Sequence, residues 1–239
     1  MKELAEKLSS WIEEQVIKAD CQGVVVGLSG GLDSSVVAVL CKRAFPENTL
    51  GVLMPCQSSK IDLDHAWEIA RRFDIPTEIV PLDELFNSLL KALPSEGLDT
   101  ETQKLAEANL KPRLRMLTLY YLANRLNYLV VGTGNRSELA VGYFTKYGDG
   151  GVDIRPLGNL VKSQVRELAS YLGIPKEIIE KPPSAGLWPG QTDEEEMGIS
   201  YKELDRYLTT RRASRKVLKR VRALARASAH KRKLPPTPP

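Results

Sequence analysis

The chain has 239 residues, of which 42% are hydrophobic and 27% are charged, a composition typical of a globular protein of about one domain. No run of about 18 apolar residues occurs, so the sequence predicts no transmembrane helix and no membrane partner. The first 20 residues form an amphipathic helical pattern containing acidic residues and lack the basic start and apolar centre of a signal peptide. We therefore expect a cytoplasmic protein.

The cysteines exclude some kinds of site. Cys21, Cys41 and Cys56 form no CxxC pair and are odd in number, so neither a disulfide framework nor a metal site of cysteines is indicated. We expect three buried free thiols. A nucleophilic cysteine is the alternative, but the only histidines, His65 and His230, are not close to a cysteine in sequence.

Basic residues dominate the segment 206–233, although the net charge of the chain is only +4. Such a run can indicate a surface that binds nucleic acid. The alternative is a helix with a solvated basic face and an apolar face formed by Val217, Leu218, Val221, Leu224 and Ala225. Aromatic stacking groups are missing here, since Tyr207 is the last aromatic residue, and we therefore expect no nucleic-acid partner.

Short β-branched runs alternate with helical segments, which predicts a doubly wound α/β fold whose mostly parallel sheet has helices on both faces. After the N-terminal helix, the expected strands are Gly23–Leu28, Thr49–Met54, Thr77–Val80 and Tyr128–Val131. The expected helices between them are Ser34–Phe45, Asp62–Phe73, Leu82–Leu93 and Arg113–Leu126.

The connection before the last of these helices has no clear pattern. Residues 94–112 are expected to be less regular, and Pro112 indicates a break before the helix Arg113–Leu126. Beyond the last strand we expect a glycine-rich turn at Tyr147–Gly151 and a helix at Ser163–Leu172.

Proline and glycine also dominate two later segments. Lys181–Gln191 is too rich in both for a regular element and is expected to be a loop. The last third of the chain is otherwise expected to be helical and to end in a frayed tail, 234–239.

The strand Gly23–Leu28 leads directly into the sequence Ser-Gly-Gly-Leu-Asp-Ser-Ser at residues 29–35, where a helix begins. Adjacent glycines let backbone N–H groups approach a ligand, and the N-terminus of a helix adds unpaired donors and the positive end of its dipole. The loop lacks the Gly-Lys-Ser/Thr ending of a Walker A sequence. These features predict a phosphate-binding loop of another type.

Asp33 in this loop would repel phosphate unless a cation lay between them. Mg²⁺ is such a cation, because it binds one or two carboxylates together with phosphate oxygens. The alternative is that Asp33 is only a favourable acidic residue in the first turn of its helix. The arrangement strand, SGG, Asp-Ser, helix favours the metal-binding interpretation.

The SGGLDSS loop resembles the phosphate loop of the ATP pyrophosphatase family, whose members cleave ATP between the α- and β-phosphates. From about residue 20 to 235 the chain closely resembles the NAD synthetases within that family. The resemblance is carried by GTGNRSE at 132–138, GYFTKYGDGG at 142–151, PSAGLW at 183–188, GQTDE at 190–194 and HKR at 230–232. It implies an adenine nucleotide α-hydrolase-like fold in a single domain over 1–239.

The resemblance also implies roles for individual residues. It assigns ATP binding to Gly27, Leu28, Ser29, Gly30, Gly31, Leu32, Asp33, Ser34, Thr133, Lys162 and Ser184. It assigns Mg²⁺ to Asp33 and Glu138, and the substrate deamido-NAD to Arg113, Lys146, Asp153, His230 and Lys231. Without the resemblance, Glu138 and Lys162 would be taken as surface charges.

The implied reaction is ammonia-dependent amidation of deamido-NAD to NAD through an adenylate, with ATP cleaved to AMP and pyrophosphate. Asp149 is the candidate for binding ammonium or receiving its proton, and the alternative is an ordinary turn residue. The segment before the first strand leaves no room for the glutaminase domain of glutamine-dependent members, so we expect free ammonia as the nitrogen donor. The alternative is a separate glutaminase subunit that supplies the ammonia. The loop Lys181–Gln191 is expected to close over the site and exclude water.

The resemblance further implies a homodimer. The helices Arg113–Leu126 and Ser9–Ile17 are candidate interface elements, or they pack only on the sheet. Two other functions remain open: a different ATP pyrophosphatase, such as one that modifies tRNA, and a nucleotide sensor without catalytic activity. The positions of the three cysteines do not suit the first, and the combination of Asp33, Glu138 and Lys162 argues against the second.

Overall fold

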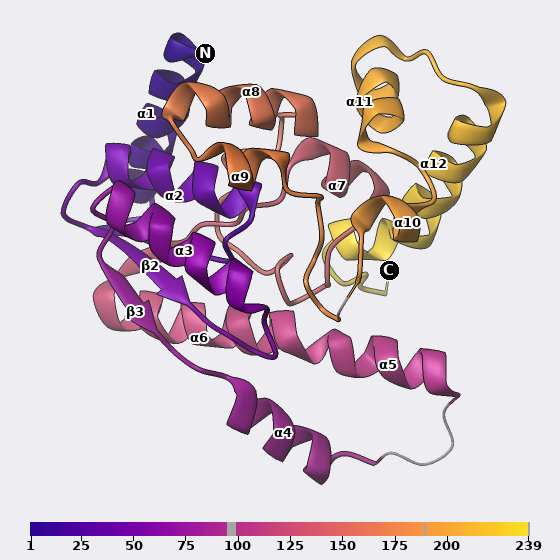
Figure 1. Ribbon diagram of the computed structural model, residues 1–239, viewed down its shortest axis with the longest axis horizontal. Coiled ribbons are helices and arrows are strands. Elements are labelled where there is room, and N and C mark those ends of the chain that lie inside the picture. Colours follow the sequence, from indigo (N-terminus) through magenta and orange to yellow (C-terminus); the bar gives the residue numbers. More distant parts are fainter. Residues whose placement is uncertain (95–98, 189, 239) are drawn as a thin grey trace.

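The computed structural model describes residues 1–94, 99–188 and 190–238, and within them a parallel sheet of four strands forms the centre of the fold (Figure 1). Its strands are β1 (Gly23–Gly27), β2 (Thr49–Leu53), β3 (Thr77–Ile79) and β4 (Tyr128–Val130). They lie in the order β3-β2-β1-β4, with Val25 of β1 opposite both Leu50 and Val130. The chain therefore moves outward from β1 in one direction and returns to its other side for β4.

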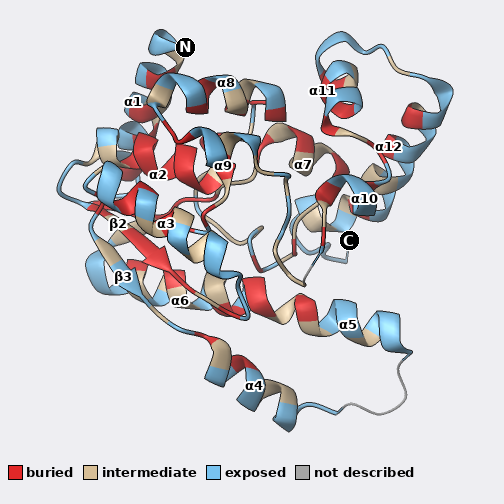
Figure 2. Cartoon of the chain, viewed as in Figure 1, coloured by how far each residue is buried: buried red, intermediate tan, exposed pale blue. Residues whose placement is uncertain are grey.

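Helices cover both faces of the sheet. Successive side chains of β1 point to opposite faces, and because they are apolar, each face needs a layer of helices to bury it. Val24 and Val26 belong to a core shared with α1 (Lys2–Lys18), α2 (Leu32–Ala44), α3 (Lys60–Arg72), α8 (Lys162–Leu172) and α9 (Lys176–Glu180). Val25 belongs to a second core on the opposite face, with α4 (Asp83–Ala92) and α6 (Leu110–Leu126). Figure 2 shows the buried residues concentrated in α2 and the strands between these layers.

The remaining helices gather beside the sheet, toward the C-terminus (Figure 1). A third apolar core joins α7 (Arg136–Val141), α10 (Asp193–Met197), α11 (Tyr201–Thr210) and α12 (Arg215–Ala227). A short 3-10 helix, η1 (Ala229–Arg232), follows α12. This core contains Val141 of α7, so the C-terminal helices are fixed to the helix that follows β4.

The structure confirms the predicted α/β fold and all four predicted strands, but it corrects the region before α6. The supposedly irregular residues 94–112 contain α5 (Thr100–Ala108), and α6 begins at Leu110 instead of Arg113. Pro112 does not break the helix, because in the first turn its missing N–H would have no partner within the helix. The segment that connects α4 to α5 includes residues 95–98, which lie outside the described residues.

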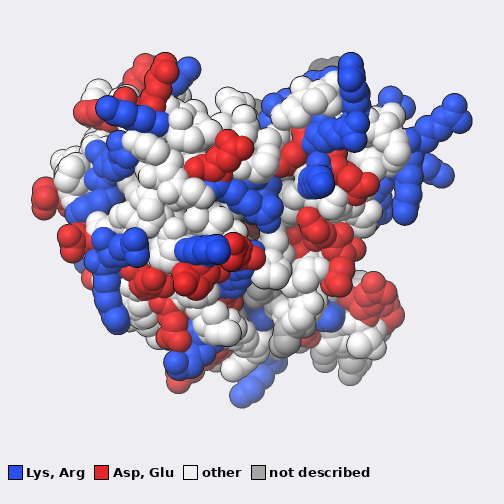
Figure 3. Space-filling model, turned by 45° about the horizontal axis from the view of Figure 1, so that its top comes forward, with Lys and Arg blue, Asp and Glu red and all other residues white. Residues whose placement is uncertain are grey.

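Further expectations are confirmed in the described residues, with Cys21 as an exception. In the basic segment, α12 buries Val217 and Val221 and half-buries Leu218, Leu224 and Ala225, while its basic side chains are solvated and gather over the region of α11 and α12 in Figure 3. The cysteines are free thiols, as expected, but only Cys41 and Cys56 are buried; the expectation of burial is wrong for Cys21, which is half-buried. Lys181–Gln191 lacks regular structure where it is described, as does the tail up to residue 238. Residues 189 and 239 lie outside the described part.

Of the helices in the part of the chain that the structure describes, none combines the length and apolar character needed to cross a membrane.

Candidate active site

A cavity of about 910 Å³ opens at the carboxyl ends of β1 and β4. These two neighbouring strands are where the strand order reverses, and in open α/β sheets ligands bind at that point. The loop after β1 forms one wall, and the segments after β4 form the opposite wall. The fold thus brings the predicted phosphate loop and the GTGNRSE segment together.

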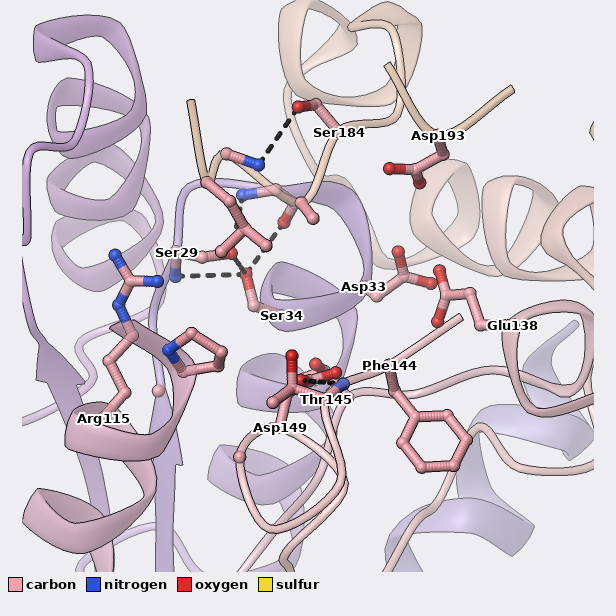
Figure 4. Close-up of a pocket in the computed structure, with 18 of the residues that line it drawn as sticks. Ser29, Asp33, Ser34, Arg115, Glu138, Phe144, Thr145, Asp149, Ser184 and Asp193 are labelled. Atoms are coloured by element: carbon pink, nitrogen blue, oxygen red, sulfur yellow. Dashed lines mark hydrogen bonds between the residues drawn. The ribbon is translucent and has the colours of Figure 1, made fainter. Parts of the chain in front are cut away.

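The phosphate loop is held in shape by its own hydroxyl groups. Ser34 Oγ donates to the carbonyl of Gly31 at 3.0 Å and lies 2.9 Å from Ser29 Oγ, as Figure 4 shows. Gly30 has φ of +71°, and a Cβ there would lie 2.0 Å from the Asp62 carbonyl oxygen of α3. No side chain in the described residues caps the N-terminus of α2, so its first N–H groups remain available to an anionic ligand.

A buried ion cluster lies beside this loop. Lys162 at the start of α8 is only 3% exposed, and its Nζ donates to Asp33 Oδ2 and, at 3.1 Å, to Glu138 Oε1. Asn135 donates to Asp33 Oδ1 at 2.9 Å, and its backbone N–H donates to Glu138 Oε2 at 3.1 Å. Three elements, α2, α7 and α8, thus bring Asp33, Glu138 and Lys162 together as the resemblance implied.

The pKa values of the cluster follow from burial and charge. Burial raises the pKa of Glu138 above its ordinary value, the Asp33 charge raises it further, and Lys162 only partly offsets both. Burial also acts to lower the pKa of Lys162, but Asp33 and Glu138 outweigh it and raise that pKa above its ordinary value. Lys162 therefore stays a cation at the floor of the cavity.

The backbone position of Lys162 is fixed by residues that the sequence did not reveal. Asp205 of α11, 6% exposed, accepts a hydrogen bond from the Ser163 N–H at 2.7 Å and one from Ser137 Oγ at 2.6 Å. Ser137 Oγ in turn accepts from the Lys162 N–H at 3.2 Å. Asp205 thus caps the N-terminus of α8 from another helix. In the sequence, Asp205 falls on the same helical face as Tyr201 and Leu204, and an acidic residue on a buried face is the signal that could have revealed its role.

Asp33 and Glu138 form a donor set that fits Mg²⁺. Both side chains keep some exposure, 16% and 15%, where they face the cavity. Among residues 1–94, 99–188 and 190–238, no group of three or more His, Cys, Asp or Glu side chains is placed to hold a metal ion. Mg²⁺ commonly takes one or two protein carboxylates and completes its coordination with water and phosphate oxygens. Two carboxylates beside a phosphate loop match that pattern.

The other end of the cavity is basic. Arg113, Lys146, His230 and Lys231 line it, in agreement with four of the five positions implied for the dinucleotide. Lys231 Nζ donates to the carbonyl groups of Gly142 and Phe144, which ties η1 to the segment after α7. These side chains come from α6, η1 and the segment after α7, so the basic end depends on the tertiary fold.

Two of the predicted residues do not line the cavity. Asp153 is exposed elsewhere, and its carboxylate accepts hydrogen bonds from Tyr120 Oη at 2.9 Å and the Val130 N–H at 2.7 Å. Gly30 lies on the side of the phosphate loop that packs against Asp62 of α3. The other residues predicted to bind ATP, Thr133 and Ser184 among them, do line the cavity.

Asp149 does line the cavity and is exposed to it (Figure 4). Its carboxylate accepts from the Thr145 N–H at 2.8 Å. Desolvation by the surrounding protein raises the pKa of Asp149, although hydrogen bonds from the backbone act to lower it.

Arg115 is a site residue that the sequence analysis did not predict. It lines the cavity and donates to the Met54 carbonyl at 3.2 Å.

The loop Lys181–Gln191 borders the cavity, and its described residues are attached to both walls. Lys181 pairs with Asp62 of α3. On the other side, the buried Lys111 of α6 donates to the Leu187 carbonyl at 2.7 Å. Trp188 lines the cavity and lies against Lys104 of α5, whose Nζ is 4.6 Å from the ring centroid.

Comparison with known proteins agrees with this geometry. The family model for NAD synthase matches residues 4–235. The NH(3)-dependent NAD(+) synthetase of Carboxydothermus hydrogenoformans is 52% identical, over 99% of this chain and 97% of that protein.

Solved structures resemble the whole fold. NMN synthetase from Francisella tularensis has a TM-score of 0.92 and 39% identity, with 99% of this chain and 98% of that one covered. NH3-dependent NAD synthetase from Campylobacter jejuni has a TM-score of 0.82 and 32% identity, with 100% and 99% covered. The chain belongs to the NAD synthase family.

Proposed function

We propose that this chain is an ammonia-dependent NAD synthetase, which amidates deamido-NAD to NAD while ATP is cleaved to AMP and pyrophosphate. The observation that supports this most directly is the cluster of Asp33, Glu138 and Lys162 beside the phosphate loop. The names of the relatives support ammonia as the nitrogen donor and the dinucleotide as the substrate. The rival ATP pyrophosphatase and sensor functions have no comparable support.

In the first step, the nicotinate carboxylate oxygen attacks the α-phosphorus of ATP, and the bond to the bridging oxygen breaks with release of pyrophosphate. The N–H groups at the start of α2 and the Lys162 ammonium would bind the phosphates and stabilise charge on the leaving group. Mg²⁺ held by Asp33 and Glu138 would neutralise phosphate charge. Catalysis would then rest on positioning and electrostatics, without a side-chain nucleophile.

In the second step, ammonia attacks the activated carbonyl carbon and AMP leaves with its bonding electron pair. The nitrogen must lose a proton, and Asp149 is the proposed acceptor because it faces the cavity and desolvation by the surrounding protein favours its protonated form. The basic end of the cavity, with Arg113, Lys146 and Lys231, would hold the anionic groups of the dinucleotide.

A second candidate substrate is the mononucleotide. The similar Francisella tularensis protein is an NMN synthetase, and it covers nearly the whole of this chain. The chemistry at the carboxylate would be the same for nicotinate mononucleotide, and only the AMP half of deamido-NAD would be missing. The two substrates therefore differ in the contacts made at the basic end of the cavity.

A homodimer would suit the exposed apolar side chains of α6. Leu117 and Tyr121 are 62% and 60% exposed, and they lie one and two helical turns beyond Arg113. Ile17 at the end of α1, the other candidate interface helix, is 66% exposed. Sedimentation equilibrium of the wild type and of Leu117→Asp would test this proposal, since a charged side chain in the interface should shift the protein toward the monomer.

The proposed function is tested by product analysis. The purified protein would be given ATP, Mg²⁺ and ammonium with either deamido-NAD or nicotinate mononucleotide, and glutamine would replace ammonium in parallel. Formation of NAD with equal amounts of AMP and pyrophosphate, lost in Asp33→Ala, would support the proposal. A higher kcat/KM with the mononucleotide would favour NMN synthesis. ATP cleavage without either amide would contradict both substrates.

A further inference from the structure

One buried carboxylate oxygen next to the ion cluster has no partner. Asp193, the first residue of α10, is 4% exposed, and its Oδ2 accepts a hydrogen bond from Tyr201 Oη at 2.8 Å. Within the described part of the chain, its buried Oδ1 accepts no hydrogen bond. Buried polar atoms without a partner are rare and unfavourable, so this oxygen needs an explanation.

Carboxyl groups outnumber ammonium groups around Lys162. Figure 4 shows the carboxyl groups of Asp33, Glu138 and Asp193 around the same part of the cavity. Lys162 is bonded to the first two. Tyr201 Oη lies near both Glu138 Oε1, at 3.3 Å, and Asp193 Oδ2, but its single proton can serve only one acceptor at a time. Three carboxyl groups therefore face one ammonium group.

The ammonium group of Lys162 also occupies the place that a metal ion would need. It is bonded to the same two carboxylates, Asp33 and Glu138, that would bind Mg²⁺. Two cations on the same carboxylate oxygens repel one another strongly in a buried site. The ammonium group must therefore move when a metal binds, and a buried ammonium needs another acceptor.

We propose that Lys162 takes the place of the metal ion in the nucleotide-free protein and moves its ammonium group to the unpartnered oxygen of Asp193 when the metal binds. This inference rests on the metal site of the proposed function. Asp193 is the acceptor within reach, since Lys162 Nζ lies 5.0 Å from the ring centroid of Tyr201, whose hydroxyl is bonded to Asp193. Asp193 is then a positioning residue for Lys162.

The test measures binding of Mn²⁺ alone to the protein without nucleotide, by electron paramagnetic resonance of free Mn²⁺ and by calorimetry. Lys162→Met should bind Mn²⁺ at least about tenfold more tightly than the wild type, because the competing cation is gone. Asp193→Asn keeps the shape of the side chain and its bond to Tyr201, and it should bind Mn²⁺ about fivefold more weakly. Lys181→Met is the matched control, because it removes a lysine that pairs with Asp62 instead, and its affinity should stay within about twofold of the wild type.

The double variant Lys162→Met, Asp193→Asn separates the inference from a simple charge effect. Without Lys162, the loss of Asp193 should change Mn²⁺ affinity by less than about twofold. An equal loss in both backgrounds would mean that Asp193 acts only through its charge, and the inference would be overturned. It would also be overturned if Lys162→Met bound Mn²⁺ no more tightly than the wild type.

Failure of the proposed metal site has a different signature. If neither the wild type nor Lys162→Met bound Mn²⁺, the metal assignment and this inference would both fall. Mn²⁺ binding without the expected pattern would remove only the inference. Thermal unfolding checks that each variant folds. If Lys162→Met does not fold, the comparison of Asp193→Asn with the wild type tests the inference instead. Unchanged Mn²⁺ affinity in Asp193→Asn would then overturn the inference.

Discussion

Asp205→Asn is the substitution that tests how the fold positions Lys162. The carboxamide keeps the shape of the side chain and can still accept from the Ser163 N–H, but its amide group cannot accept from Ser137 Oγ. One buried hydrogen bond to a charged acceptor is lost, which is worth about 1.5–3 kcal/mol. For a chain of this size, each kcal/mol lowers Tm by about 2–4 °C. We therefore expect a decrease in Tm of about 3–12 °C.

The same substitution should impair catalysis, because Ser137 Oγ also holds the Lys162 N–H. A small displacement at the start of α8 would move the ammonium group away from the phosphates, and we expect kcat/KM for ATP to fall by about tenfold or more. Calorimetry and initial rates measure the two effects. The matched control is Asp64→Asn, which removes an exposed ion pair with Lys60 and should change stability by less than about 1 kcal/mol. An Asp205→Asn protein with wild-type Tm and kinetics would refute the reasoning.

Three further predictions follow from the cavity. Gly30→Ala should abolish ATP binding measured by calorimetry and lower Tm, because its Cβ would collide with the Asp62 carbonyl; wild-type binding would contradict this. Desolvation by the surrounding protein raises the pKa of Asp149, so wild-type stability should fall as pH rises from the ordinary carboxyl range through the folded pKa. Asp149→Asn has no carboxyl group there and should not lose stability in this way. The free energy of unfolding of the variant in urea, minus that of the wild type, should therefore increase with pH. A difference that stays constant with pH would argue against a raised pKa. Lys181→Met should cost less than about 1 kcal/mol, since its ion pair is partly exposed, but should raise the rate of proteolysis within 181–191 if the pair holds the loop.

The sequence predicted the sheet and the phosphate loop because both are local patterns. Short β-branched runs alternating with helical segments specify parallel strands, and the two glycines before Asp33 specify a turn at the start of a helix. The prediction around Pro112 was wrong for a local reason as well. Proline usually indicates a break in regular structure, but it is compatible with the first turn of a helix, where Pro112 lies.

The cluster around Lys162 could not be predicted from local patterns alone. Its members come from helices far apart in sequence, and nothing in the spacing of Asp33, Glu138 and Lys162 shows that they meet; the resemblance to a family supplied that. Asp193 and Asp205 read as ordinary acidic residues at or within helices. Only the packing of α10 and α11 against α7 and α8 buries them and makes their hydrogen bonds specific.

Attack by a carboxylate oxygen of the substrate on the α-phosphorus of ATP transfers that oxygen to AMP. Deamido-NAD carrying ¹⁸O in both oxygens of the nicotinate carboxylate reveals this transfer, with mass spectrometry of the products after complete turnover. We expect one ¹⁸O atom in the phosphate of AMP, one in the amide of NAD and none in pyrophosphate. Unlabelled AMP, or label in pyrophosphate or inorganic phosphate, would contradict it.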